Sequence, residues 1–194
     1  AQYGLRALWS VIDAWRKLAQ GQMMDFPNDK PIQPQMYENI IGLKTAPLFQ
    51  VASELGIRAG KHEWLVNVGR EYGHNCGMAF QVYDDYCDMV GNIGAPWGSI
   101  SKGGPLPTSM AALKIRSGGD DFISHEQCAN VLQMGASYVT TAERVAQSFP
   151  DTPVKGLLLE LPQACCDSLL AEAGITPKTA EKEREPEPQL SEEG

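Results

Sequence analysis

The sequence has no framework of paired cysteines, no excess of basic charge and no apolar run long enough to cross a bilayer. Its five cysteines are odd in number and none forms a Cys-x-x-Cys pair, so neither a disulfide scaffold nor a zinc site is expected. With 16 Lys and Arg against 24 Asp and Glu, the net charge of −8 argues against nucleic acid or an anionic membrane as the main partner. Free thiols and the lack of a secretory leader favour a cytoplasmic protein.

What the chain does contain is helical periodicity. Apolar residues recur at helical spacing from residue 1 to about residue 24. The same pattern predicts further helices over 35–55, 62–90, 106–117, 124–148 and 153–173. No alternating segment predicts a strand, so the expected fold class is all-α. We expect one helical domain over 1–175 and a disordered charged tail over 176–194.

Proline and glycine give the predicted helices special features. Pro47 lies inside the second helix, so a kink is expected just after Lys44 and Thr45, and Gly56 is placed to end that helix. The third helix carries glycines four residues apart, which share one face: Gly69, Gly73 and Gly77. These glycines indicate either the close approach of a neighbouring helix or space beside a ligand cavity.

The third predicted helix ends in a cluster of aspartates, in the stretch FQVYDDYCD at 80–88. Asp84 and Asp85 follow Gln81 by three and four residues, and Asp88 lies one turn after them, so an amide and several carboxylates share one face. Like charges at this spacing destabilise a helix, and burial makes them costlier. A divalent cation removes that cost, and carboxylates suit Mg²⁺, which keeps several waters and bridges to phosphates. The alternative is a solvated acidic patch with no ligand.

A lysine and a threonine stand next to each other in an otherwise apolar turn, GLKTAPLF at 42–49. Lys44 supplies a cation and Thr45 a hydroxyl donor, and both are good phosphate ligands. Lys102, in the glycine-rich stretch 91–105, is a third candidate phosphate contact. For an isolated lysine the ordinary alternative is a snorkelling side chain, so the case depends on the motifs taken together.

In this order and spacing, four stretches resemble the trans-polyprenyl diphosphate synthases, the family of farnesyl and geranylgeranyl diphosphate synthases. They are GQMMDF, KTAPLF, ASELGIRAG and YGHNCGMAFQVYDDYCDMVG. The last is similar to the family's second aspartate-rich motif, Asp-Asp-x-x-Asp preceded by Phe-Gln. The resemblance covers roughly residues 1 to 115. It implies an all-α bundle around a deep apolar cavity and a prenyltransferase that condenses an allylic diphosphate with isopentenyl diphosphate through Mg²⁺-assisted ionisation.

The resemblance also implies roles for individual residues at the aspartate cluster. Asp84, Asp85 and Asp88 would be Mg²⁺ ligands, and Phe80 would line the cavity. The physics agrees with these roles, because metal ions stabilise the charge left on a departing diphosphate and a carbocation needs a dry apolar pocket.

The remaining implied roles concern the diphosphate. Lys44, Thr45 and Gln81 would contact the diphosphate or steady the cation. Lys102 would approximate the family's lysine in the following loop, although the family's lysine stands one residue nearer the Leu-Pro pair, at Gly103.

The first aspartate-rich motif of the family, the arginine that follows it and the isopentenyl-binding region have no counterpart in this sequence. The helical pattern also starts at Ala1 without a capping residue. We therefore expect an upstream part of the fold to be absent and the chain to be inactive alone. A homodimer, or a heteromer with a chain that carries the first motif, is the expected assembly. The alternatives are a non-catalytic regulatory or complementing subunit of a heteromeric prenyl synthase, and a terpene cyclase of the same fold, although Asp-Asp-x-x-Asp favours chain elongation.

Overall fold

The fold is built from helices, as the periodicity predicts. A computed structural model describes residues 4–27, 31–90, 107–117 and 125–175, and within these ranges it contains no strand. The helices are α1 (Gly4–Asp25), α2 (Met36–Lys44), α3 (Ala46–Ala59), the short 3-10 turn η1 (Glu63–Leu65), α4 (Val66–Val90), α5 (Thr108–Ser117), α6 (His125–Ala146) and α7 (Pro153–Glu172). The all-α prediction is confirmed. The predicted tail 176–194 lies outside the described residues.

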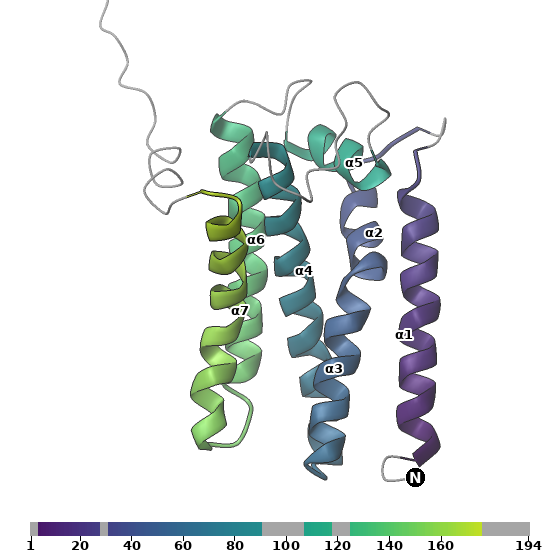
Figure 1. The fold of residues 1–194 in the computed structure, drawn as a ribbon, viewed down its shortest axis with the longest axis vertical. Helices are drawn as coiled ribbons and strands as arrows, with labels where there is room; N and C mark the ends of the chain where they lie inside the picture. Colours follow the sequence, from purple (N-terminus) through teal and green to yellow (C-terminus); the bar gives the residue numbers. More distant parts are fainter. Residues whose placement is uncertain (1–3, 28–30, 91–106, 118–124, 176–194) are drawn as a thin grey trace, which may run out of the picture.

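The helices stand side by side around α4. Figure 1 shows α2 and α3 on one side of α4, α6 and α7 on the other, α1 at the edge beyond α2 and α3, and α5 across the top. Most of the buried side chains lie where α4 meets its neighbours, among them Ile41 of α2, Val82 and Tyr86 of α4, and Val131 of α6. None of the described helices is long and apolar enough to span a membrane.

The predicted second helix is in fact two helices. The break falls at Thr45, whose backbone has φ −125° and ψ −51°, and Pro47 then sits in the first turn of α3. The position predicted for a kink is confirmed, but Gly56 does not end the helix. The chain continues to Ala59 because Arg58 pairs with Glu54 at 2.8 Å, which stabilises the turn that contains the glycine.

The three glycines of α4 allow α3 to pack unusually closely. A Cβ at Gly77 would lie 2.7 Å from the Cα of Ala46, and one at Gly73 would lie 2.3 Å from the carbonyl oxygen of Phe49. A Cβ at Gly69 would meet the side chain of Ile57. Close approach of a neighbouring helix is therefore the correct interpretation of these glycines. The packing brings the break between α2 and α3 against the carboxyl-terminal half of α4.

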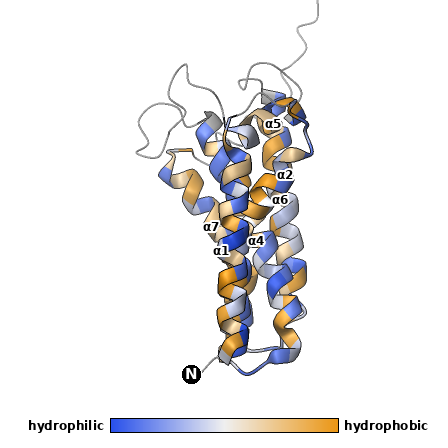
Figure 2. Cartoon of the chain, turned by 90° about the vertical axis from the view of Figure 1, so that its right-hand side faces the viewer, coloured by the Kyte–Doolittle hydropathy of each residue, from blue (hydrophilic) through white to orange (hydrophobic). Residues whose placement is uncertain are grey.

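One face of α1 is apolar and exposed. Its large side chains are largely accessible, with Leu5 74%, Trp9 65% and Trp15 66% exposed. Figure 2, which looks onto α1, shows hydrophobic segments along this helix. An apolar face of this kind on a single chain is typical of a surface that another polypeptide covers.

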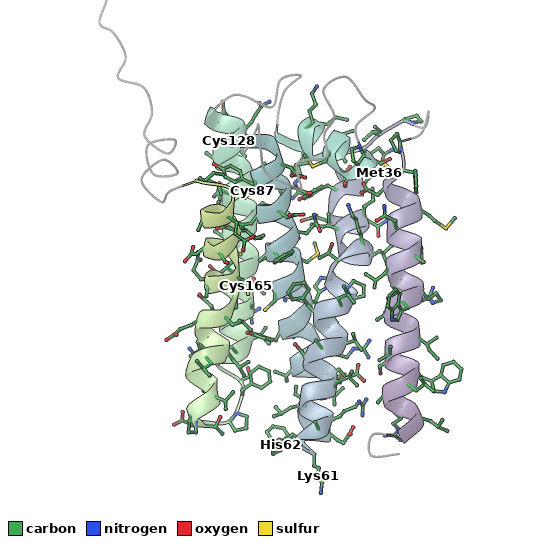
Figure 3. All side chains as sticks on the ribbon, in the orientation of Figure 1. Met36, Lys61, His62, Cys87, Cys128 and Cys165 are labelled. Atoms are coloured by element: carbon green, nitrogen blue, oxygen red, sulfur yellow. The ribbon has the colours of Figure 1, made fainter. Side chains whose placement is uncertain are left out.

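The cysteines are free, as the sequence predicts. Cys76, Cys128 and Cys166 are buried, and Cys87 and Cys165 are partly buried. Cys87, Cys128 and Cys165 are labelled in Figure 3 and lie on three different helices.

Candidate active site

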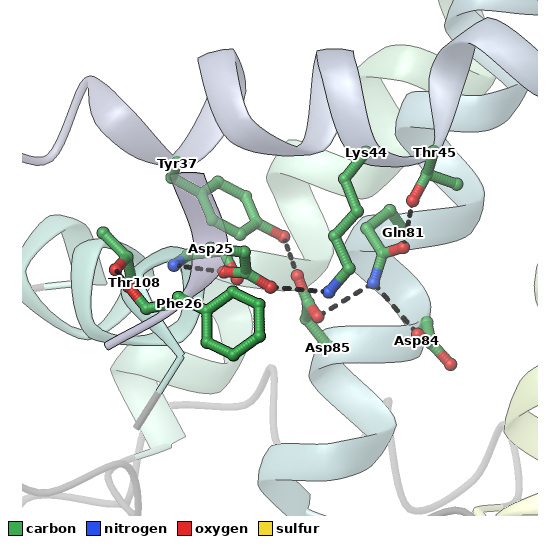
Figure 4. A network of polar contacts seen from close by, with 10 residues as sticks. Asp25, Phe26, Tyr37, Lys44, Thr45, Gln81, Asp84, Asp85 and Thr108 are labelled. Carbon is green, nitrogen blue, oxygen red and sulfur yellow. Dashed lines mark hydrogen bonds and ion pairs between the residues drawn. The ribbon is translucent and has the colours of Figure 1, made fainter. Parts of the chain in front are cut away.

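The break between α2 and α3 places Thr45 against the acidic end of α4. The hydroxyl of Thr45 donates to Oε1 of Gln81. The amide nitrogen of Gln81 donates to Oδ2 of Asp84 at 2.9 Å and to Oδ1 of Asp85 at 3.0 Å. Figure 4 shows this chain of polar contacts running from α2 into α4. Gln81 is thereby fixed in one orientation, with its carbonyl toward the hydroxyl and its NH₂ toward the carboxylates.

Asp85 is the most deeply buried of the three aspartates. Its side chain is almost fully enclosed, and Tyr37 of α2 donates its O–H to Oδ2 of Asp85 at 2.7 Å. Together with Gln81, Tyr37 gives each oxygen of this carboxylate a hydrogen-bond donor. Asp84 and Asp88 are only partly buried. The three carboxylates therefore differ in environment, and Asp85 is the one that the protein itself holds in place.

Lys44 is held from the other side by Asp25, the last residue of α1. The ammonium of Lys44 lies 2.7 Å from Oδ2 of Asp25, whose carboxylate is buried. The approach of α1 to this point depends on Gly21, because a Cβ there would lie 2.3 Å from the backbone nitrogen of Lys44. A larger residue at this position would push α1 away from the lysine.

The pKa values of the acidic cluster are all raised. Burial is the main cause for each, and it raises the pKa of Asp85 to about 7 even though the hydrogen bonds from Tyr37 and Gln81 oppose it. Burial, with the charge of Asp84, raises the pKa of Asp88 to about 6. Burial also raises the pKa of Asp84, against the hydrogen bond from Gln81. Ionisation of these carboxylates is therefore disfavoured in the absence of a bound cation, chiefly because the cluster is buried.

Two carboxylates of α4 are of the kind that could hold a magnesium ion. Among the described residues no group of three or more His, Cys, Asp or Glu side chains is placed to hold a metal ion. Asp84 and Asp88, four apart on α4, instead offer oxygen donors from partly buried carboxylates with raised pKa values. Mg²⁺ is usually bound by one or two carboxylates, with waters and substrate phosphates filling the other positions. The donor set suits that arrangement.

The structure brings together most of the residues predicted from the sequence. Five of them form a continuous group with Asp25 and Tyr37: Lys44, Thr45, Gln81, Asp84 and Asp85. Asp88 lies one turn further along α4. Phe80 is half-buried and its ring centroid lies 5.4 Å from that of Phe49, while Lys102 lies outside the described residues.

Two residues of the group were not predicted. Asp25 lies in the stretch GQMMDF, just beyond the predicted end of the first helix at about residue 24, where no functional role is expected. Tyr37 precedes Lys44 by seven residues and so shares a helix face with it, which is a signal that the sequence does contain.

Two hollows accompany the site. A groove of about 610 Å³ runs beside the carboxyl end of α1 and is lined by Met23, Met24, Phe26 and Met36, among others. A pocket of about 420 Å³ is lined by residues of α2, α4, α5 and α6, where Arg116 lies 2.9 Å from Glu38. The lining of the groove is mostly apolar, and two of its residues, Met24 and Phe26, flank Asp25 in the sequence.

Comparison with known protein families shows to which family the chain belongs. The sequence profile of the family described as polyprenyl synthetase matches residues 2–98, which is half of the chain. The chain belongs to this family. The match includes all of the polar group from Lys44 to Asp88, and it confirms the resemblance given by the sequence motifs. The members are prenyl diphosphate synthases, which are prenyltransferases.

Individual relatives cover part of the chain. The chain is 34% identical over 121 residues to a short chain isoprenyl diphosphate synthase from Methanothermobacter thermautotrophicus, an alignment that covers 59% of this chain and 37% of that protein. It is 37% identical over 76 residues to a geranylgeranyl diphosphate synthase from Sulfolobus acidocaldarius, covering 38% of this chain and 23% of that protein. The chain thus spans well under half of the length of these curated relatives.

Solved structures show the same fold. A geranylgeranyl pyrophosphate synthetase from Pyrococcus horikoshii superimposes with a TM-score of 0.68 at 20% identity, covering 84% of this chain and 58% of the other. A decaprenyl diphosphate synthase from Rhodobacter capsulatus gives a TM-score of 0.66 at 21% identity, covering 87% of this chain and 61% of the other.

Proposed function

We propose that this chain supplies the second metal-binding half of a trans-prenyltransferase site. The proposed reaction joins an allylic diphosphate to isopentenyl diphosphate. The observation that carries the proposal is the convergence of Lys44 and Thr45, at the break after α2, with Gln81 and the aspartates of α4. Cations and hydrogen-bond donors next to clustered carboxylates are what a magnesium diphosphate requires.

Each residue of the site would have a separate role in the reaction. Asp84 and Asp88 would hold Mg²⁺, which when bound supplies charge stabilisation for the departing diphosphate. Lys44 would donate to a diphosphate oxygen. The hydroxyl of Thr45 and the carbonyl of Gln81 form one dipolar pair, and that pair would face the allylic carbon as positive charge develops there. Asp85, fixed by Tyr37 and Gln81, would set the orientation of the last turns of α4.

The assembly is a second part of the proposal. The apolar face of α1, with Leu8, Trp9 and Ile12 exposed, would be covered either by a second copy or by a chain that carries the first aspartate-rich motif. The first motif has no counterpart in this sequence, so the chain alone is proposed to have little condensation activity. A non-catalytic complementing subunit remains the alternative, since the same exposed face would also serve it.

A chimaera tests catalysis directly. The part of the Methanothermobacter thermautotrophicus synthase that aligns with this chain would be replaced by the corresponding residues of this chain. The proposal predicts radiolabelled prenyl product, lost in Asp84→Asn and retained in the matched control Glu71→Gln, which lies exposed on the same helix and within the residues that the family profile matches. A folded chimaera that binds diphosphate but forms no product would favour the non-catalytic alternative.

A further inference from the structure

Asp25 makes two different contacts with its two carboxylate oxygens. Oδ2 lies 2.7 Å from the ammonium of Lys44 on α2, and Oδ1 accepts the backbone N–H of Ser109 on α5 at 2.8 Å. The side chain is only 4% exposed, although it ends a surface helix. A second hydrogen bond, from the Thr108 hydroxyl to the Phe26 carbonyl at 2.7 Å, joins the same two segments. Figure 4 shows Asp25 between Thr108 and Lys44.

Lys44 has other anions within reach. The carboxylates of Asp85 and Asp84 act on its charge, and Lys44 in turn acts on Asp88. A lysine ammonium sits on a flexible four-carbon stem and moves readily to the nearest available anion. If the contact with Asp25 were lost, the next partners would be the carboxylates at the end of α4. Such a pair would occupy the oxygens that a divalent cation needs.

We propose that Asp25 is a positioning residue that holds the ammonium of Lys44 on the α1 side of the site. The carboxylates at the end of α4 then stay available to a divalent cation, and lysine and cation can face one diphosphate from two sides. This inference rests on the proposed function, which supplies the diphosphate ligand. The position of the Lys44 ammonium, however, concerns the chain without any ligand. Asp25 acts through Lys44 and does not itself contact the diphosphate.

The two contacts of Asp25 can be separated by mutation. In Asp25→Asn, the side-chain carbonyl still accepts from the Ser109 N–H, while the charge that holds Lys44 is gone. In Thr108→Val, the tie between α1 and α5 is weakened, while the pair between Asp25 and Lys44 remains. Thr108 is not among the residues assigned to the diphosphate. The two variants therefore separate the effect of moving the Lys44 side chain from the effect of weakening the contact between α1 and α5.

The first test is a double-mutant cycle in which calorimetry measures the binding of inorganic pyrophosphate in the presence of Mg²⁺. We expect Lys44→Gln to weaken binding by about 30-fold, as expected for a lost charge-assisted hydrogen bond, and Asp25→Asn to weaken it by about tenfold. In the Lys44→Gln background, Asp25→Asn should change affinity by less than about twofold. Thr108→Val should lower the urea midpoint and leave affinity unchanged. Additive losses in the double variant, or an unaltered Asp25→Asn, would overturn the proposal.

A crystal structure of ligand-free Asp25→Asn is the second test and does not depend on the diphosphate. Nζ of Lys44 should move to about 3 Å from a carboxylate oxygen of Asp84 or Asp85. An ammonium that stays beside residue 25 would overturn the positioning role even if pyrophosphate binds. A wild-type chain that binds no magnesium pyrophosphate would instead refute the proposed function, and the crystal structure alone would then decide the positioning role.

Discussion

Replacement of Asp85 by asparagine should stabilise the folded chain at alkaline pH but not at acid pH. In the folded chain the pKa of Asp85 is raised to about 7, mainly by burial, whereas an unfolded aspartate titrates near about 3.9. The folded state therefore binds the extra proton between these values, and stability falls as pH rises through this window. The full difference is about 3 pKa units, or about 4 kcal/mol, lost once pH is above 7.

The asparagine has no charge to bury, but it also fits the site less well. Its carbonyl can still accept from Tyr37, while its NH₂ faces the NH₂ of Gln81, so one hydrogen bond worth about 1 kcal/mol is lost. In metal-free protein, Asp85→Asn should thus be about as stable as wild type at pH 4.5, where about 1 kcal/mol of the wild-type stability is already lost, and more stable by about 3 kcal/mol at pH 8.

Urea unfolding followed by circular dichroism, in EDTA at pH 4.5, 6 and 8, measures how the stability difference between variant and wild type grows with pH. Asp167→Asn serves as the control for loss of an exposed aspartate, and its stability relative to wild type should not change with pH in this way. A variant that is less stable than wild type by the same amount at all three pH values would refute the reasoning. It would mean that Asp85 is not protonated in the folded chain near neutral pH.

Three further changes test other parts of the account. Gly77→Ala should destabilise the fold by about 2 kcal/mol in urea unfolding, because the added methyl would lie 2.7 Å from the Cα of Ala46, and an unchanged midpoint would mean that α3 and α4 are further apart. Tyr37→Phe removes the O–H that donates to the carboxylate of Asp85. It should therefore lower the free energy of unfolding by about 1–3 kcal/mol at pH 8 and by less at pH 4.5. A loss of stability that does not vary with pH would contradict this. Trp9→Glu on the exposed face of α1 should shift the chain toward monomer in light scattering, whereas a wild-type chain that is already a monodisperse monomer would show that this face needs no cover.

Local sequence patterns predicted much of the fold because helix periodicity and proline are local signals. The aspartate helix, the break near Thr45 and the close packing at the three glycines all follow from residues near one another in sequence. The end of α3 was missed because the glycine signal at Gly56 competes with an ion pair formed by Arg58, and the ion pair extends the helix.

The polar group could be predicted only in part, for a different reason. The carboxylates, Lys44 and Gln81 stand in recognisable motifs, but their partners come from other helices. Asp25 reaches Lys44 only because Gly21 lets α1 pack against α2, and that contact depends on tertiary structure. The raised pKa of Asp85 likewise depends on burial by neighbouring helices, which no local pattern reports.

Calorimetry with Mg²⁺ and an allylic diphosphate such as geranyl diphosphate, added together and separately, tests the central claim most directly. A single carboxylate cluster leaves Mg²⁺ mostly hydrated, so the account predicts weak binding of Mg²⁺ alone and much tighter binding when the diphosphate is present. Asp84→Asn should abolish the gain from adding both, and Asp167→Asn should preserve it. Tight binding of Mg²⁺ without diphosphate, or diphosphate binding that is the same with EDTA as with Mg²⁺, would contradict a metal-dependent diphosphate site on α4.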